Sequence, residues 1–227
     1  TILIQGPQSG MMEADTVLVG GNVTVPAGEQ LIFKAGTRVI ATGHFGFDVH
    51  GSISAIASAD SPITFTVADT SGFSNYENGR GGWDGLHFTG TDPYSDSSVF
   101  EYCRFEYGKA VGDSLEKMGG IFNIRNFGRI SVSNCTFISN YAYHWGGAIF
   151  AESGDICISH CLFTDNVCGQ EAPPYGYGGA VCFRHYRPDI SYCEFTGNTS
   201  TGIGGALSLE YTDAQISKNK FYENFSG

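Results

Sequence analysis

The amino-acid sequence predicts an all-β protein: a single-stranded, right-handed parallel β-helix, or solenoid, with a base period of about 26 residues per coil. Three observations lead to this fold class. A Gly-Gly-apolar phrase occurs four times, a second phrase recurs in step with it, and only 15% of the residues are charged. A period in the twenties is typical of a solenoid, whose coils bury a continuous core only when they are stacked.

The two repeated phrases define the coils. The Gly-Gly phrase is found in the segments "KMGGIFNIRN" (117–126), "HWGGAIFAES" (144–153), "GYGGAVCFRH" (176–185) and "GIGGALSLEY" (202–211). The other phrase, apolar-x-x-Cys-x-Phe-x-x-Asn, is found in "VSNCTFISN" (132–140), "ISHCLFTDN" (158–166), "ISYCEFTGN" (190–198) and, with Asn replacing Cys, "ISKNKFYEN" (216–224). Helical spacing of apolar residues and the Leu-x-x-Leu-x-Leu pattern are both absent from these segments, so short strands with alternating side chains are predicted.

Stacked coils place residues of one repeat phase directly over each other, about 4.8 Å apart. We therefore expect three columns of side chains. They are an inward thiol column of Cys103, Cys135, Cys161 and Cys193 that continues with Asn219, a ring column of Phe105, Phe137, Phe163, Phe195 and Phe221, and an amide ladder of Asn140, Asn166, Asn198 and Asn224. The paired glycines fit a tight corner that a Cβ would block.

The chain is predicted to form one domain, residues 1–227, with divergent coils in 1–98 and regular coils in 99–227. Because it stops inside a repeat, we expect it to be excised from a larger protein. The segments "VTVPAGEQL", "GSISA", "PITFT" and "WDGLHF" resemble secreted bacterial β-helix modules of the pectate-lyase-like superfamily. The Gly-Gly-Ala and Asn-Cys-x-Phe phrases resemble repeats of polymorphic outer-membrane proteins. Both resemblances imply the β-helix fold.

Charge and cysteine content narrow the classes of function. The net charge of −11 disfavours binding to nucleic acid, anionic membranes and polyanionic glycans. No apolar run is long enough to span a membrane as a helix. The seven Cys include no CxxC pair, and the odd count leaves at least one thiol. We expect a secreted or cell-surface bacterial protein, and reduced thiols would suit an anaerobic habitat.

Motifs that would indicate catalysis are missing. The Asn-x-Asp, Asp-Asp, Gly-His-Gly and Arg-x-Lys motifs of polygalacturonase-like hydrolases do not occur, and "RHYRPD" (184–189) resembles the arginine motif of pectate lyases without its surrounding pattern. Each of the six His is expected to be a surface or strand residue, because none has metal-ligand spacing with Cys or Asp. We predict no catalysis and no cofactor. A structural Ca²⁺ bound by acidic loops such as 89–98 is kept as an alternative, although no ligand spacing supports it.

The variable positions of the repeat are the candidate site. Counted from the second Gly, the third residues (Asn123, Phe150, Cys182, Ser208) and the fifth residues (Arg125, Glu152, Arg184, Glu210) are expected to point outward. The charges of the fifth residues alternate in sign. This pattern fits either a surface ladder of ion pairs or a hydrogen-bonding strip for sugar hydroxyls. Aromatic residues precede the glycines, and they form either a packed ladder or an exposed platform for a sugar ring. Insertions within 106–117 and 167–177 are expected to wall a groove.

These patterns favour a non-catalytic carbohydrate-binding module for a neutral plant cell-wall polysaccharide, with xylan favoured. The predicted ligand-binding residues are Arg125, Tyr143, His144, Trp145, Glu152, Tyr175, Tyr177, Arg184 and Glu210. Size and fold resemble β-helical modules attached to bacterial xylanases, which implies a monomer linked covalently to a catalytic domain. The alternatives are a polysaccharide lyase or glycoside hydrolase, and a cell-surface adhesin or passenger segment.

Overall fold

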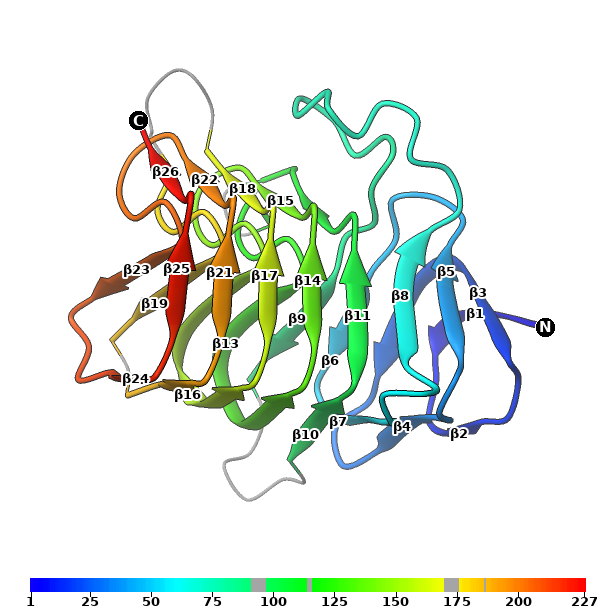
Figure 1. Ribbon diagram of the computed structural model, residues 1–227. Coiled ribbons are helices and arrows are strands. Elements are labelled where there is room, and N and C mark those ends of the chain that lie inside the picture. Colours follow the sequence, from blue (N-terminus) through cyan, green and yellow to red (C-terminus); the bar gives the residue numbers. More distant parts are fainter. Residues whose placement is uncertain (91–96, 114–115, 170–175, 186) are drawn as a thin grey trace.

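The computed structural model describes residues 1–90, 97–113, 116–169, 176–185 and 187–227. Its strands form one sheet of 21 strands and one of 5, and the strand pairs of both sheets are parallel. Figure 1 shows the chain winding from the N-terminus at one end to the C-terminus at the other, with successive coils side by side. The predicted all-β parallel β-helix is therefore confirmed. The described residues contain no helix, and so none that could cross a membrane.

The strands of the large sheet form three columns, which cover three of the four sides of the coils (Figure 1). The front column contains the first halves of β1 (Ile2–Pro7) and β3 (Thr16–Val25), then β5 (Arg38–Ala41), β8 (Ile63–Val67), β11 (Cys103–Glu106), β14 (Thr136–Ile138), β17 (Leu162–Thr164), β21 (Glu194–Thr196) and β25 (Lys220–Tyr222).

A second column lies along the bottom of Figure 1. It contains β2 (Gly10–Met12), β4 (Gln30–Phe33), β7 (Ser52–Ile56), β10 (Ser98–Glu101), the second halves of β13 (Phe122–Ser133) and β16 (Ile149–Ser159), β20 (Asp189–Ser191) and β24 (Gln215–Ser217).

The third column lies behind the first and carries the candidate site. It contains the second halves of β1 and β3, β6 (Phe47–Val49), β9 (Leu86–Thr89), the first halves of β13 and β16, β19 (Val181–Arg184) and β23 (Leu207–Glu210). The small sheet closes the fourth side with β12 (Lys109–Ala110), β15 (Tyr141–Ala142), β18 (Val167–Cys168), β22 (Thr199–Ser200) and β26 (Phe225–Ser226).

The predicted columns are present in the core. The phenylalanine rings stack along the coils, and the ring centroids of Phe137 and Phe163 are 4.7 Å apart at an interplanar angle of 4°. Phe65 extends this column by one coil, at 5.0 Å from Phe105. The thiol column is also confirmed, because the amide of Cys161 donates to Sγ of Cys193 at 3.4 Å and the amide of Cys193 donates to Oδ1 of Asn219 at 2.7 Å.

The asparagine ladder is continuous. Nδ2 of Asn140 donates to Oδ1 of Asn166 at 2.9 Å, and Nδ2 of Asn166 donates to Oδ1 of Asn198 at 2.8 Å. The ladder ends at Asn224, whose Oδ1 accepts from Asn198 at 2.8 Å. Asn140, Asn166 and Asn198 are buried. Each coil thus satisfies polar groups of its neighbour that water cannot reach.

The corners of the coils require a left-handed backbone, and several of these positions hold residues other than glycine. The residue before each column Cys, or before Asn219, has a φ between 51° and 56°; the set is Tyr102, Asn134, His160, Tyr192 and Lys218. Three of these side chains stack outside the coils: the rings of His160 and Tyr192 are 4.8 Å apart and parallel within 4°, and Nζ of Lys218 lies 4.6 Å from the ring centroid of Tyr192. A stacked ring presents its edge, not its face, to a ligand.

The cysteines outside the column differ in their exposure. Cys157 is exposed. Cys168 lies in β18 and is fully buried. Cys182 points out of the main core yet is also buried, and burial raises the pKa of its thiol to about 12. All seven cysteines are free thiols.

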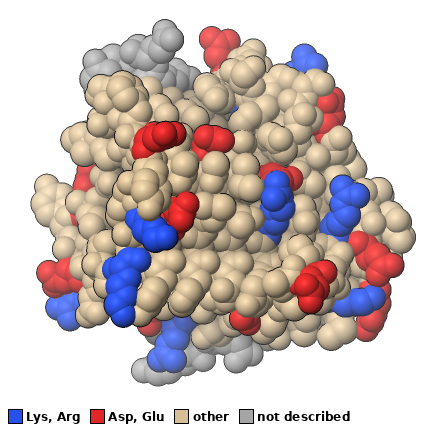
Figure 2. All heavy atoms as spheres, in the orientation of Figure 1, with Lys and Arg blue, Asp and Glu red and all other residues tan. Residues whose placement is uncertain are grey.

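Charged residues are scattered over the face formed by the front column. Figure 2 shows acidic and basic side chains there singly or in pairs of opposite sign, and neither sign forms a continuous patch. The pairs on exposed side chains include Lys34–Asp15 at 3.1 Å and Arg187–Asp213 at 3.2 Å. Exposed ion pairs of this kind contribute little to stability, and the face shown offers no basic surface to a polyanion.

Candidate functional site

The fifth residues of the repeat form a row of ion pairs on the third column, which we call the charged strip: Arg125, Glu152, Arg184 and Glu210. Nη1 of Arg125 lies 3.4 Å from Oε2 of Glu152, and Nη1 of Arg184 lies 3.8 Å from Oε1 of the same carboxylate. Nε of Arg184 lies 2.8 Å from Oε2 of Glu210. The side chains are 21–30% exposed, so the strip is a half-buried surface feature.

A second row lies beside the strip, in the loops that lead into the third column. Bridge pairing joins Met118 to Trp145, Trp145 to Tyr177 and Tyr177 to Ile203. We call these four residues the aromatic row; their alignment agrees with that expected from the glycines. Trp145 and Tyr177 are partly exposed, and their ring centroids are 6.4 Å apart at 79°. The choice between packed ladder and exposed platform thus resolves into a row that is packed on one side and open on the other.

The third residues of the repeat were expected to point outward, and the structure shows in addition that solvent does not reach them. Asn123, Phe150, Cys182 and Ser208 are all buried. Phe150 and Cys182 form a small apolar cluster with Met118, separate from the main core and covered by Trp145 and Tyr177. Alternation places these side chains outside the coil correctly, but the loop before each glycine pair folds back over them and excludes water.

The two rows are in direct contact. Cζ of Arg184 lies 4.4 Å from the ring centroid of Trp145, and Cζ of Arg125 lies 5.2 Å from that of Phe150. Nη2 of Arg125 is 2.8 Å from Sδ of Met118. Burial lowers the pKa of Arg125, against the opposing effect of Glu152. Each guanidinium is fixed between a carboxylate and an apolar surface, so little side-chain entropy remains to be lost when a ligand binds.

Two further predicted residues, Tyr143 and His144, directly precede Trp145 of the aromatic row. Tyr143 and His144 are both partly exposed, with ring centroids 4.7 Å apart. Nζ of Lys117 lies 4.1 Å from the ring centroid of Tyr143. Burial, followed by the charge of Lys117, lowers the pKa of His144, so its imidazole is neutral at neutral pH. Tyr175 lies outside the described residues, as do parts of both insertions that were expected to wall a groove.

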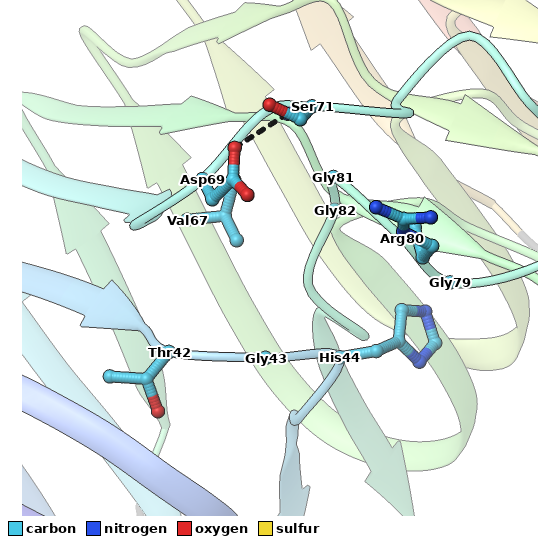
Figure 3. Close-up of a pocket in the computed structure, with 10 residues that line it drawn as sticks. All are labelled: Thr42, Gly43, His44, Val67, Asp69, Ser71, Gly79, Arg80, Gly81 and Gly82. Carbon is cyan, nitrogen blue, oxygen red and sulfur yellow. Dashed lines mark hydrogen bonds between the residues drawn. The ribbon is translucent and has the colours of Figure 1, made fainter.

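A cavity of about 400 Å³ lies elsewhere, beside the loop that connects β8 to β9 (Figure 3). His44, Asp69 and Arg80 line it, with Thr42, Ser71, Val67 and several glycines. The repeat pattern of the sequence does not indicate these residues. The available signal was the long stretch after Val67, which lacks alternation and is rich in Gly, Asn and Ser. Long irregular loops in compact domains are often functional.

Lys109 fixes this loop from inside. The side chain is fully buried, and Nζ donates to the carbonyl oxygens of Gly72 at 3.2 Å, Asn75 at 2.8 Å and Arg80 at 2.7 Å. It also lies 5.5 Å from the ring centroid of Phe73. Burial lowers the pKa of Lys109 to about 8, so the ammonium form prevails at neutral pH. One cation therefore joins three carbonyls of the loop, and only that of Gly72 is also paired within the loop, by the amide of Asn75 at 3.0 Å.

Replacing Lys109 by methionine should release the loop, because three carbonyls lose a charged donor while the apolar contacts persist. We expect amide exchange of residues 72–80 to become about 10- to 100-fold faster, as a loss of roughly 1.5–3 kcal/mol in local stability implies. Hydrogen exchange followed by mass spectrometry measures this directly. The matched control is Lys34→Met, which removes only an exposed ion pair. Equal exchange in the two variants would contradict the proposed role of Lys109.

Two histidines share one carboxylate, that of Asp84. Nε2 of His44 lies 3.9 Å from Oδ1 of Asp84, and Nε2 of His87 lies 3.5 Å from Oδ2. Burial lowers the pKa of His87, but hydrogen bonding to Asp84 and the charges of Asp84 and Asp48 outweigh it, so the pKa is raised overall. Within the described part of the chain, no group of three ligating side chains has a geometry that could hold a metal ion.

Comparison with known proteins adds one finding. Residues 134–152 and 192–210 match the Chlamydia polymorphic membrane protein repeat. Each matched segment starts at a left-handed corner and ends in the charged strip, at Glu152 or Glu210. The match covers a minor part of the chain and contains its stacking residues, so it supports the fold. No curated protein and no solved structure matches the chain.

Proposed function

We propose that the protein binds a neutral polysaccharide without cleaving it, with a plant cell-wall xylan as the favoured ligand. The observation that carries the proposal is the contact between the aromatic row and the charged strip, repeated over adjacent coils. A sugar ring has an apolar C–H face and an edge of hydroxyls. The partly exposed Trp145 and Tyr177 suit the face, and the carboxylates and guanidiniums beside them suit the edge.

Repetition favours a polymer over a free sugar. Coils recur about every 4.8 Å, so an extended chain lying along the axis of the solenoid meets similar groups at each step. The net charge of −11 disfavours polyanionic chains such as pectate. The two carboxylates of the strip are each paired with Arg184, which leaves the strip suited to hydrogen bonding. These points together favour a neutral, linear glycan.

The repeat match suggests the setting. It supports a bacterial protein that is secreted or associated with the cell surface. In that setting we propose a monomeric module that is covalently linked to a catalytic domain and positions it on its substrate. The same match also favours a second candidate, a surface-displayed adhesin or passenger segment whose target is a host or neighbouring-cell glycan.

Affinity electrophoresis against xylan, glucan, mannan and pectin tests the proposal. We expect retardation by xylan, and about tenfold weaker retardation for both Trp145→Ala and the near-isosteric Glu152→Gln, because one lost contact of roughly 1.4 kcal/mol corresponds to that factor. Glu152→Gln keeps the packing of the loop, so its result does not depend on folding of the tryptophan variant. The matched control is Tyr222→Ala, which removes an exposed ring from β25 on the front column.

Three results would count against this function or its site. Unchanged mobility on all four polysaccharides would exclude binding of these glycans. Release of reducing ends, or of unsaturated uronides detected by their ultraviolet absorbance, would show a hydrolase or lyase instead. Retention of full binding by both Trp145→Ala and Glu152→Gln would move the site to another face.

A further inference from the structure

The cavity beside the β8–β9 loop contains hydrogen-bonding groups of both kinds. Figure 3 shows the Asp69 carboxylate, the Arg80 guanidinium and the His44 imidazole around one opening, carried by two separate segments of the chain. Asp69 only accepts hydrogen bonds and Arg80 only donates them. Among the described residues, no hydrogen bond or ion pair occupies the guanidinium of Arg80, and its five donors are open to a ligand.

The carboxylate and the imidazole are oriented by their own contacts. The backbone amide of Ser71 donates to Oδ1 of Asp69 at 2.8 Å. Hydrogen bonds from the side chain and backbone of Ser71 lower the pKa of Asp69, so it accepts as a carboxylate. Nε2 of His44 lies 2.8 Å from the carbonyl oxygen of Lys109, so Nε2 is the nitrogen that donates to this carbonyl. In the tautomer that carries its single proton there, Nδ1 is the acceptor.

The backbone around the cavity is fixed before any ligand arrives. The carbonyl of Arg80 accepts from the buried ammonium of Lys109, and the amide of Arg80 donates to Oδ1 of Asn78 at 3.0 Å. A Cβ on Gly79 would lie 2.2 Å from Cγ of His44, so only glycine lets the loop lie flat on the imidazole. Binding therefore requires little ordering of the protein.

We infer that this cavity binds a single neutral sugar residue through a pair of adjacent hydroxyls. A hydroxyl both donates and accepts, so neighbouring hydroxyls can donate to Asp69 and Nδ1 of His44 while they accept from Arg80. An anion would be repelled by Asp69, and a cation would be repelled by Arg80. The C–H groups of a pyranose suit Val67 and the glycine backbone. The inference shares its ligand class with the proposed function, but uses none of the residues of the strip.

Nuclear magnetic resonance titration of the whole chain tests the inference. The probes are the methyl glycosides of xylose, glucose and galactose, each up to about 50 mM, enough to detect the millimolar dissociation constants of weak sugar sites. We expect saturable shifts of the amide signals of Gly79, Gly81 and Gly82 with at least one sugar. Tetrahydropyran, which has the ring but no hydroxyls, should produce none.

Variants separate this site from the strip. Asp69→Asn keeps the size of the side chain and should raise the dissociation constant at least about tenfold. Asp60→Asn removes the charge of an exposed carboxylate away from the cavity and should leave the dissociation constant unchanged. Trp145→Ala should weaken retardation by polysaccharide about tenfold without altering the glycine shifts. Shifts with free amino acids but with no sugar would overturn the inference in favour of a zwitterion site. Absence of shifts with every methyl glycoside would overturn it whether or not polysaccharide binds.

Discussion

Replacing Gly147 by alanine should prevent the chain from folding stably. The new Cβ would lie 2.1 Å from the carbonyl oxygen of Gly179 and 2.6 Å from that of Val167. Both atoms are backbone atoms of the next coil, so neither can move without separating the stacked coils. Overpacking against a rigid backbone is among the few mechanisms that cost more than about 4 kcal/mol. Urea denaturation followed by circular dichroism measures the free energy of unfolding.

The control for this variant is Gly21→Ala. Like Gly147, Gly21 does not have a positive φ, but the Cβ would meet only the side chain of Gln5 at 3.2 Å, and Gln5 is exposed and flexible. We expect this substitution to change stability by less than about 1 kcal/mol. A stable Gly147→Ala protein would show that the coils can separate at this corner, contrary to the tight stacking of the second glycines.

Replacing Asn166 by alanine should have the second-largest effect. Its Oδ1 accepts from the amide and from Nδ2 of Asn140, at 3.2 and 2.9 Å. Its Nδ2 donates to the carbonyl of Phe137 at 3.0 Å and to Oδ1 of Asn198 at 2.8 Å. Removal leaves several buried polar groups without partners, each costing about 1–3 kcal/mol. We expect a loss of roughly 3–5 kcal/mol in the free energy of unfolding.

Two further substitutions make the ladder experiment specific. Asn166→Asp retains the shape but removes the donor, so its carboxylate faces two acceptors, and it should destabilise as much as alanine. Asn22→Ala removes a single partly buried acceptor of the Gly46 amide at 3.2 Å, and should cost only about 1 kcal/mol. If all three variants had equal stability in urea, the ladder would not be the source of the stabilisation.

The fold follows from the sequence because stacking turns one repeat phase into one physical column. The Phe, Cys and Asn columns, the pairing of Trp145 with Tyr177 and the ion pairs of Arg184 were all predictable from the repeat phase. What alternation cannot reveal is whether a loop covers an outward side chain, as it covers that of Phe150.

The cavity could not be predicted, because its parts are brought together by contacts between distant segments. His44 and Arg80 lie on different coils, and the loop between β8 and β9 depends on Lys109, which belongs to a later strand. A lysine in sequence normally indicates a solvated surface. Only the structure shows this ammonium inside the loop with its three carbonyl partners.

The left-handed corners separate architecture from surface chemistry. Tyr102, Asn134, His160, Tyr192 and Lys218 share one backbone conformation, yet their side chains are aromatic, amide, imidazole and ammonium. The inward residues determine how each turn of the solenoid stacks on the previous one. The side chains of the corner residues lie on the surface and do not determine this stacking. Surface side chains at the corners can therefore be substituted during evolution one turn at a time, while the stacked core of the solenoid is retained.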